Sequence, residues 1–114
     1  MNQEQANQIL LDNPSSVEFL RRDDQFGSPY GVVVSIQTED GMRTGWSRIS
    51  SEDHRDPEIV FTKNDARRRA VERAFRDENP KVTARLLGAT RAAPILAAIT
   101  STRKRAQKGL FIKV

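Results

Sequence analysis

The sequence predicts an α+β fold, in which a small antiparallel sheet packs with helices and a helical, basic C-terminal portion follows. Two runs of alternating residues, 30–38 and 42–50, flank a Gly-containing turn and predict a hairpin. Residues 62–75 repeat Ala, Val and Phe at helical spacing. The last segment, 81–114, has eight Lys or Arg and no acidic residue. We therefore expect helices on one face of the sheet and a basic helical segment after it.

The chain has the length of one ordinary domain, so we expect 1–114 to be a single domain. It contains no Cys, which excludes disulfides and thiolate zinc sites. The longest apolar run, 92–99, is too short to span a bilayer, and the N-terminus does not resemble a signal peptide. We expect a cytoplasmic protein without a membrane partner.

The first elements are a helix and a segment with two interpretations. Asn2 is a favourable N-cap for a helix that stops before Pro14. The next segment, 15–23, begins with a pattern that fits a capping box and so predicts a short helix. Its residues 17–20 are equally consistent with a strand, and the pattern does not separate the two structures.

The position of Trp46, the only Trp, depends on how the hairpin turn is built. A two-residue turn at 40–41 pairs it with Ser35 and turns it away from the β-branched face of the first strand. A three-residue turn at 39–41 pairs it with Val34 and places it among the core residues. The sole Trp stabilises a thin core most when it is buried, so we favour the three-residue turn.

The segments after the hairpin are predicted from their caps and prolines. Thr62, with Asp65 three residues later, fits the start of a helix. Pro80 is typical of a first helical turn, and Pro94 either starts or kinks the last helix. The predicted elements are a short third strand at 59–61 and helices at 62–78, 80–87 and 94–107.

The charge of the chain is divided between its two parts. Residues 1–80 contain 11 Lys or Arg and 15 Asp or Glu, whereas 81–114 contain 8 and none. Such asymmetry predicts a segment that binds a polyanion, because eight positive charges without one acid are seldom left unneutralised. The alternative is that the basic segment packs on the acidic part of this chain or of a second copy.

Two basic clusters are the candidate phosphate-binding residues. Arg67 and Arg68 follow the start of the 62–78 helix, where basic residues oppose the helix dipole. Acids four residues from an Arg, as in Asp65–Arg69, favour a salt-bridged and solvated helix face instead. The second cluster lies in the last turns of the 94–107 helix and just after it, where the dipole accounts for one or two cations but hardly for four. Its members are Arg103, Lys104, Arg105 and Lys108.

The sequence shows no pattern typical of an enzyme. His54, the only His, is followed by closely spaced acids without a specific ligand pattern, so we predict no metal and no other cofactor. Neither a Gly-rich phosphate loop nor a nucleophile elbow is present.

Residues 62–75, TKNDARRRAVERAF, resemble the last helix of double-stranded-RNA-binding domains. That family has the order helix, three antiparallel strands, helix, which 2–78 also resembles. The resemblance implies that Lys63 and Arg67, together with Asn64, contact phosphates across the groove of an RNA duplex. Asn64 stands where the family has a Lys.

A second resemblance is to small uncharacterised bacteriophage-type proteins. It rests on a GVVV strand, a GWS return strand, an FxK segment and an AxxRA helix pattern, which here are 31–34, 45–47, 61–63 and 70–74. This resemblance implies a viral or prophage source, in which case the chain would act in the host cytoplasm.

Taken together, these patterns predict a non-enzymatic, phage-type accessory protein that binds nucleic acid, either DNA or RNA, through Lys63 and the two basic clusters. The alternative is a small effector that binds and modulates a host protein, which the thin core and scattered apolar residues favour. A homo-oligomer associated with the virion is a third possibility.

Overall fold

The computed structural model describes residues 1–22, 27–49, 61–76 and 88–109, and for 89–91 it describes the backbone alone. These segments form three helices and one antiparallel sheet of order β1-β2-β3. The elements are α1 (Gln3–Asp12), β1 (Ser15–Arg21), β2 (Pro29–Thr38), β3 (Gly41–Arg48), α3 (Lys63–Ala74) and α5 (Ala89–Gln107). The predicted α+β class with an antiparallel hairpin is confirmed.

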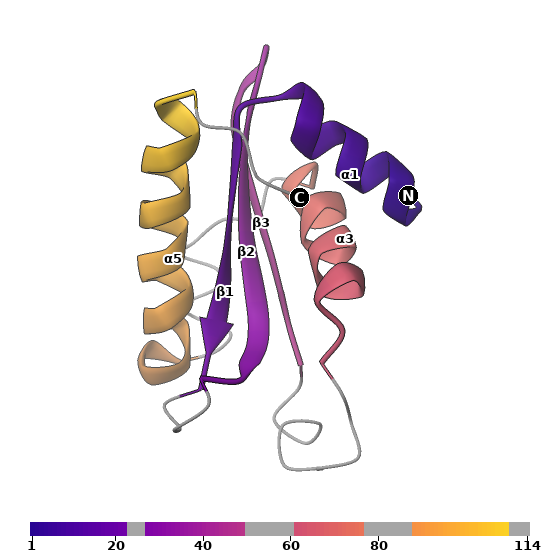
Figure 1. Ribbon diagram of the computed structural model, residues 1–114. Coiled ribbons are helices and arrows are strands. Elements are labelled where there is room, and N and C mark those ends of the chain that lie inside the picture. Colours follow the sequence, from indigo (N-terminus) through magenta and orange to yellow (C-terminus); the bar gives the residue numbers. More distant parts are fainter. Residues whose placement is uncertain (23–26, 50–60, 77–87, 110–114) are drawn as a thin grey trace.

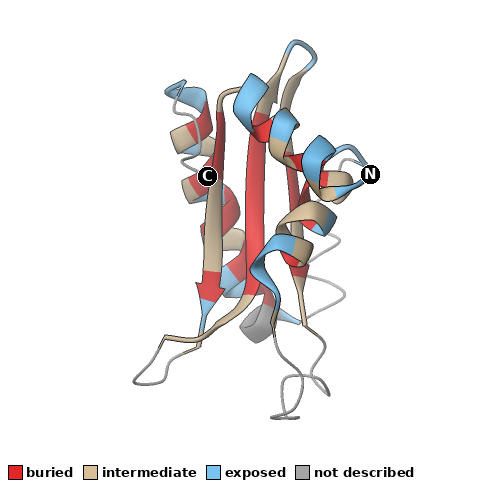
Figure 2. Ribbon diagram, turned by 45° about the vertical axis from the view of Figure 1, so that its right-hand side comes forward, coloured by how far each residue is buried: buried red, intermediate tan, exposed pale blue. Residues whose placement is uncertain are grey.

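Helices cover both faces of the sheet. Figure 1 shows α5 on one side of the strands and α1 with α3 on the other. The expectation that helices pack on one face alone is therefore wrong. The reason lies in β2, where Val32, Val33 and Val34 are all fully buried, so that successive side chains need apolar neighbours on opposite faces. Figure 2 shows this buried central strand.

The face toward α1 and α3 carries the larger core. Val32, Val34 and Ile36 of β2 pack there against small residues of both helices. Phe19 and Phe61 close one edge of this core with an edge-to-face contact between rings 6.4 Å apart. The buried helix residues are Ala6, Leu10, Ala66, Ala70, Val71 and Ala74. Phe75, which the sequence assigned to the same stripe, is 42% exposed and lies under the Arg43 guanidinium instead.

The face toward α5 carries a second core, built from Val33, Leu20 and the inner residues of the helix. Ile95, Ala98 and Ile99 are buried there, and Tyr30, Trp46 and Leu96 pack around them. α5 starts at Ala89, earlier than predicted, and contains Pro94 within it rather than at its first turn.

The two interpretations of 15–23 are resolved in favour of a strand. Ser15–Arg21 pairs with β2 along its whole length, with Val17 opposite Val34. The third strand of the described sheet is therefore β1 and not 59–61, of which 59–60 lie outside the described residues, as does the predicted helix 80–87. The helix predicted at 62–78 is shorter than expected, because α3 ends at Ala74 with Phe75 as its C-cap. Upstream, Asn2 caps α1 as predicted, in a reciprocal capping box with Gln5.

Both predicted forms of the hairpin turn are wrong. Thr38 pairs with Gly41, which leaves Glu39 and Asp40 as the two loop residues, and Gly41 takes the positive φ of 116°. Trp46 is consequently opposite Val33, on the face that α5 covers. The preference for a buried Trp46 rested on the expectation that helices cover only one face of the sheet. Trp46 is instead half-buried beneath α5, because the second face is covered as well.

Gly45 of β3 lets α3 approach the sheet closely. A Cβ on this residue would overlap the Ala70 carbonyl oxygen and the Ala74 amide nitrogen, and would lie 2.9 Å from the Ala74 Cα. These are backbone atoms of α3, so they move only if the helix moves. The absence of a side chain at Gly45 thus sets the distance between α3 and β3.

We expect Gly45→Ala to lower the free energy of unfolding by at least about 2 kcal/mol, because the added methyl group forces α3 away from the sheet. Urea denaturation of the purified chain measures this change. Thr100→Ala, at an exposed position of α5, serves as the control and should shift stability by no more than about 0.5 kcal/mol. Equal stability of Gly45→Ala and the unaltered chain would contradict the close approach.

Candidate nucleic-acid interface

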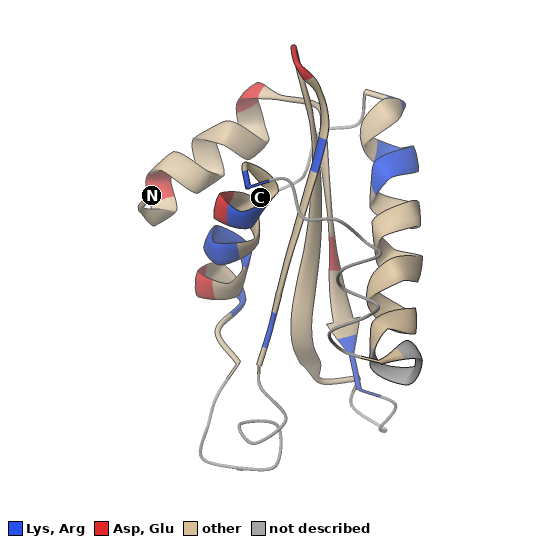
Figure 3. Ribbon diagram, turned by 180° about the vertical axis from the view of Figure 1, so that it is seen from behind, with Lys and Arg blue, Asp and Glu red and all other residues tan. Residues whose placement is uncertain are grey.

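The seven candidate residues do not form one surface. Lys63, Arg67 and Arg68 lie on α3, whereas Arg103, Lys104 and Arg105 lie on α5, with Lys108 directly after it. α3 and α5 pack on opposite faces of the sheet, so the sheet separates the two clusters (Figure 3). Each cluster must therefore be judged by its own surroundings.

The start of α3 combines backbone amides that the N-cap side chain leaves uncapped with an exposed cation. Thr62 takes the N-cap position, but it caps the helix without a side-chain hydrogen bond, so the predicted capping interaction is absent. The amides of the first turn thus lack an acceptor inside the helix, apart from the Ala66 amide, which donates to the Thr62 carbonyl. Lys63 and Asn64 are exposed at this end, and the Lys63 ammonium lies 5.1 Å from the centre of the Phe19 ring.

Arg67 connects α3 with α1 through neutral groups. Its Nη2 donates to the side-chain oxygens of Asn7 and Asn64, each at 3.2 Å. The Asn7 oxygen also accepts a bond of 3.1 Å from the amide of Gln3. No ion pair among the described residues involves Arg67, so its positive charge is not neutralised by a nearby carboxylate there. The result is a fixed guanidinium with its charge intact, one turn into the helix.

Arg68, in contrast, is held by carboxylates. Its guanidinium forms ion pairs of 2.8 Å with Asp65 and 3.0 Å with Glu72. Both an i,i+3 and an i,i+4 acid thus reach Arg68, and carboxylates of its own helix hold the charge that the sequence assigned to phosphate binding. The predicted Asp65–Arg69 pair is present at 3.2 Å. These contacts favour a structural role for Arg68.

The ion pairs of α3 lower the pKa of two carboxyl groups. The hydrogen bond from Arg68 is the main cause that holds the pKa of Asp65 below its ordinary value of 3.8. A hydrogen bond from the N-terminal ammonium of Met1 is the main cause that lowers the pKa of Glu72 from 4.5. That ammonium lies 3.2 Å from Glu72, so the pair also ties the beginning of the chain to α3.

In the α5 cluster, Arg103 ends a buried chain of hydrogen bonds. Its Nε donates to the Thr44 hydroxyl at 2.7 Å, and Thr44 is 3.0 Å from the Ser35 hydroxyl. Ser35 is 2.8 Å from Thr102, whose hydroxyl donates to the Ala98 carbonyl at 2.8 Å. Because guanidinium only donates and a carbonyl only accepts, each hydroxyl in between can donate once and accept once. The chain fastens α5 to β2 and β3.

Arg105 also serves the packing of α5, since its Nη2 forms an ion pair of 3.2 Å with Glu18 of β1. Ser101 donates to the same carboxylate at 3.2 Å. Lys104 and Lys108 are exposed, and neither forms an ion pair within the part of the chain that the structure describes. Of the four basic residues predicted here, two fasten the helix and two point to solvent.

Sequence patterns missed the contribution of α1. Asn7 and Gln3 lie about sixty positions before Arg67, and only the packing of α1 beside α3 brings them together. A polar pair at i,i+4 on a short helix is too common to indicate a site. We call the group Gln3, Asn7, Lys63, Asn64 and Arg67 the α1–α3 polar surface.

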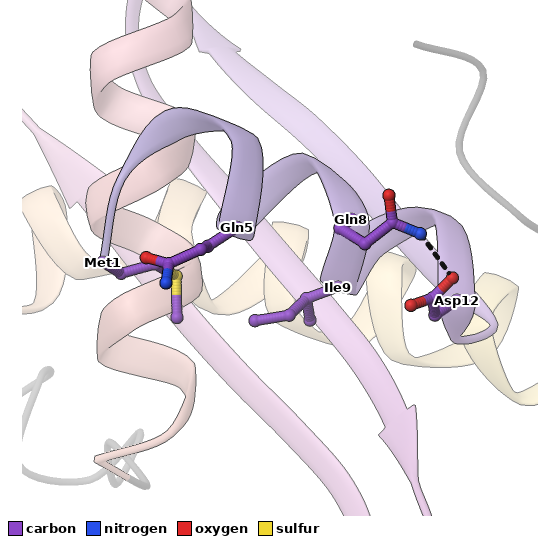
Figure 4. Close-up of a pocket in the computed structure, with 5 residues that line it drawn as sticks. All are labelled: Met1, Gln5, Gln8, Ile9 and Asp12. Atoms are coloured by element: carbon purple, nitrogen blue, oxygen red, sulfur yellow. Dashed lines mark hydrogen bonds between the residues drawn. The ribbon is translucent and has the colours of Figure 1, made fainter.

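An apolar pocket lies on the other side of α1. It has a volume of about 560 Å³ and is lined by Met1, Gln5, Gln8, Ile9 and Asp12. Figure 4 shows Gln8, which donates to Asp12 at 2.7 Å, with Ile9 near Gln8 and with Met1 beside Gln5 at the other end of the helix. The pocket carries no titratable group other than Asp12 and the chain terminus among its described lining residues.

Other kinds of site are not found among the described residues. They contain no group of three or more His, Cys, Asp or Glu that could hold a metal ion, and His54 lies outside them. No helix in the described segments is long and apolar enough to cross a membrane. Comparisons of the chain with protein-family models, curated proteins and solved structures found no match.

Within the α5 cluster, some basic residues stabilise the fold and others are exposed. We expect Arg103→Ala to lower the free energy of unfolding by about 1 to 2 kcal/mol, because it removes the donor that begins the buried hydroxyl chain. Lys104→Ala, one residue further on, should change stability by less than about 0.5 kcal/mol. Chemical denaturation of both variants is the measurement, and equal stabilities would contradict the role of Arg103.

Acid should weaken the packing of α1 on α3. The pKa values of Asp65 and Glu72 are lowered on folding, so their stabilising contribution is fully present above the ordinary values of 3.8 and 4.5. It is lost as the pH falls through the lowered values. We expect the double variant Asp65→Asn, Glu72→Gln to flatten the decrease in melting temperature between about pH 5 and pH 2. An unchanged acid branch in this variant would show that these ion pairs do not contribute.

Proposed function

We propose that this chain is a non-enzymatic protein that binds nucleic acid through the α1–α3 polar surface. The observation that carries the proposal is the guanidinium of Arg67, held 3.2 Å from two amide oxygens instead of by a carboxylate. A carboxylate partner would neutralise the guanidinium, whereas an amide oxygen accepts its hydrogen bond and carries no charge. An amide partner positions the side chain and leaves its charge available to a phosphate.

The surroundings of Arg67 favour an anion as the ligand. The uncapped amides at the start of α3 and the positive end of its dipole stabilise a bound anion by about 0.3 to 1 kcal/mol. Lys63 adds a second, exposed cation at this end. Asn7, Asn64 and Gln3 supply amide groups that can donate to phosphate or sugar oxygens. Each contact contributes little free energy, so binding requires contacts to several phosphates. Such contacts release counterions, and the affinity should therefore fall as the salt concentration rises.

The arrangement of the elements supports a nucleic-acid duplex. The described residues from α1 to α3 follow the order helix, three antiparallel strands, helix, and both helices pack on one face of the sheet. This is the order that the resemblance to double-stranded-RNA-binding domains implies, and Lys63, Asn64 and Arg67 are the residues it assigns to phosphate contact. We extend the proposal to a phage-type accessory protein on the strength of the strand and helix patterns alone.

The test compares two pairs of charge removals on the same helix. We expect Lys63→Gln with Arg67→Gln to weaken binding to a short duplex at low salt by about tenfold or more, and to reduce the slope of log K against log salt by about 1 to 2. Fluorescence anisotropy with RNA and DNA duplexes of one sequence, and with the single strand, measures both quantities.

Arg69→Gln with Arg76→Gln removes the same charge from exposed positions of α3 and its end, and serves as the matched control. This pair should leave the salt slope nearly unchanged. Equal losses in the two pairs would show that only the overall charge matters. Undetectable binding of every probe at low salt would overturn the proposed function.

A second candidate function is the binding of a host protein, and the apolar pocket beside α1 favours it. Met1, which is 44% exposed, and the half-buried Ile9 both line this pocket. Exposed apolar groups around a pocket are typical of protein contacts. Affinity purification from the host with nuclease treatment tests this function. We expect one host protein to stay bound after the treatment and to be lost from the Ile9→Asp variant, whose binding to duplexes should be unaffected.

A further inference from the structure

The end of α5 carries positive charge that the packing of the helix does not use. We call Arg103, Lys104, Arg105 and Lys108 the α5 basic end. Arg103 and Arg105 are bonded to Thr44 and Glu18, whereas Lys104 and Lys108 are exposed. Lys104 lies in the last turn of α5, and Lys108 is the C-cap residue that follows the helix. The end of the helix dipole accounts for one or two cations at this position, and the cluster has four.

The balance of charge at this end remains positive. Among the residues that the structure describes, Glu18 is the carboxylate that forms an ion pair with the cluster, and it neutralises one of the four cations. The end of a helix dipole contributes roughly half a negative charge. Within the described residues, about two and a half positive charges are left once the ion pair and the dipole are subtracted. The α5 basic end thus has the electrostatic character of a phosphate-contacting surface.

The α5 basic end and the α1–α3 polar surface lie at opposite corners of the molecule. Lys63 sits over Phe19, which pairs with Val32, toward the end of β1. Arg103 contacts Thr44, whose partner Ser35 is three residues further along β2, toward the hairpin turn. The two points are therefore separated by about 10 Å along the strand as well as by the thickness of the sheet with a helix on each side. Figures 1 and 3 show α3 starting at one end of the sheet and α5 finishing at the other.

One straight duplex cannot contact both surfaces. A single duplex would have to turn around a molecule whose extents are 39 × 29 × 26 Å. Bending by 40 to 90° over 20 to 30 base pairs already costs about 1 to 6 kcal/mol, and passing from one face to the opposite one requires more. Two exposed lysines do not recover that cost. Two separate segments can occupy the two surfaces without any bending.

We propose that the two surfaces hold two separate nucleic-acid segments, so that one molecule of this protein bridges them. The inference rests on the proposed function for the α1–α3 polar surface and adds a second site with a different task. The first surface has positioned amide and guanidinium groups, whereas the α5 basic end offers mobile lysines that act as point charges. We expect the α1–α3 polar surface to supply most of the affinity for one duplex, and the α5 basic end to contribute when another duplex is captured.

A capture experiment tests bridging apart from binding. One duplex is fixed to beads, a second duplex of the same sequence carries a fluorophore, and the full-length chain is added at low salt. We expect the unaltered chain to retain the labelled duplex on the beads. Lys104→Gln with Lys108→Gln should reduce this capture by about tenfold while affinity for a single duplex falls by a smaller factor. Arg69→Gln with Arg76→Gln, which removes equal charge from α3 and its end, should still capture.

Each outcome has a distinct meaning. Capture that survives the loss of Lys104 and Lys108 overturns bridging by the α5 basic end, and light scattering then shows whether a dimer of this chain accounts for it. Binding of a single duplex without capture by the unaltered chain overturns bridging and leaves the proposed function intact. If no duplex binds at all, the proposed function fails and the inference fails with it.

Discussion

The central strand β2 is apolar on both faces, and the rest of the structure depends on this constraint. Val32 and Val34 face α1 and α3, and Val33 faces α5, so neither face can be left to water. Burial of three valines contributes on the order of 5 to 8 kcal/mol, a large fraction of the stability of a chain of this size. The positions of both basic clusters follow from it, because each is carried by a helix that the strand requires.

The two helix layers are held in different ways. On the α3 side, the contact is close and made of small residues, with Gly45 of β3 directly against the backbone of the helix. On the α5 side, a row of hydroxyl groups from Ser35, Thr44 and Thr102 runs through the interface. A buried hydroxyl group adds little to the free energy of unfolding when it is hydrogen-bonded, and it lowers that free energy considerably when it is left unpaired. These hydroxyl groups therefore fix the position of α5 on the sheet more than they stabilise its packing. Arg103 is part of that arrangement, which explains why half of a predicted binding cluster is engaged in packing.

The charges of α3 divide according to their partners. Arg68 and Arg69 meet carboxylates and belong to a salt-bridged helix face. Arg67 meets the amide oxygens of Asn7 and Asn64, and Lys63 lies beside the uncapped start of the helix. Neighbouring cations of one helix thus have different roles, because Arg68 and Arg69 meet carboxylates of α3 itself whereas Arg67 also reaches Asn7 of α1. The same division separates Arg103 and Arg105 from Lys104 and Lys108 on α5.

The sequence by itself determined the class of the fold, the capped helix at Asn2, the strand from 30 to 38 and the helix that starts after Thr62. These features depend on local periodicity and on cap or turn residues, which act within a few positions of the chain. It also determined that positive charge gathers after residue 81, which needs no structure at all.

Tertiary structure alone decided which face of the sheet Trp46 occupies, because the choice turned on one residue of the hairpin loop and on whether a distant helix covered the second face. It also decided that 15–21 is a strand, since pairing with β2 overrides a local helix signal. Arg67 and Arg103 have partners from segments about sixty positions away in the sequence. Local spacing carries no information about such contacts, and they are what distinguishes a cation that fastens the fold from one that is left for a ligand.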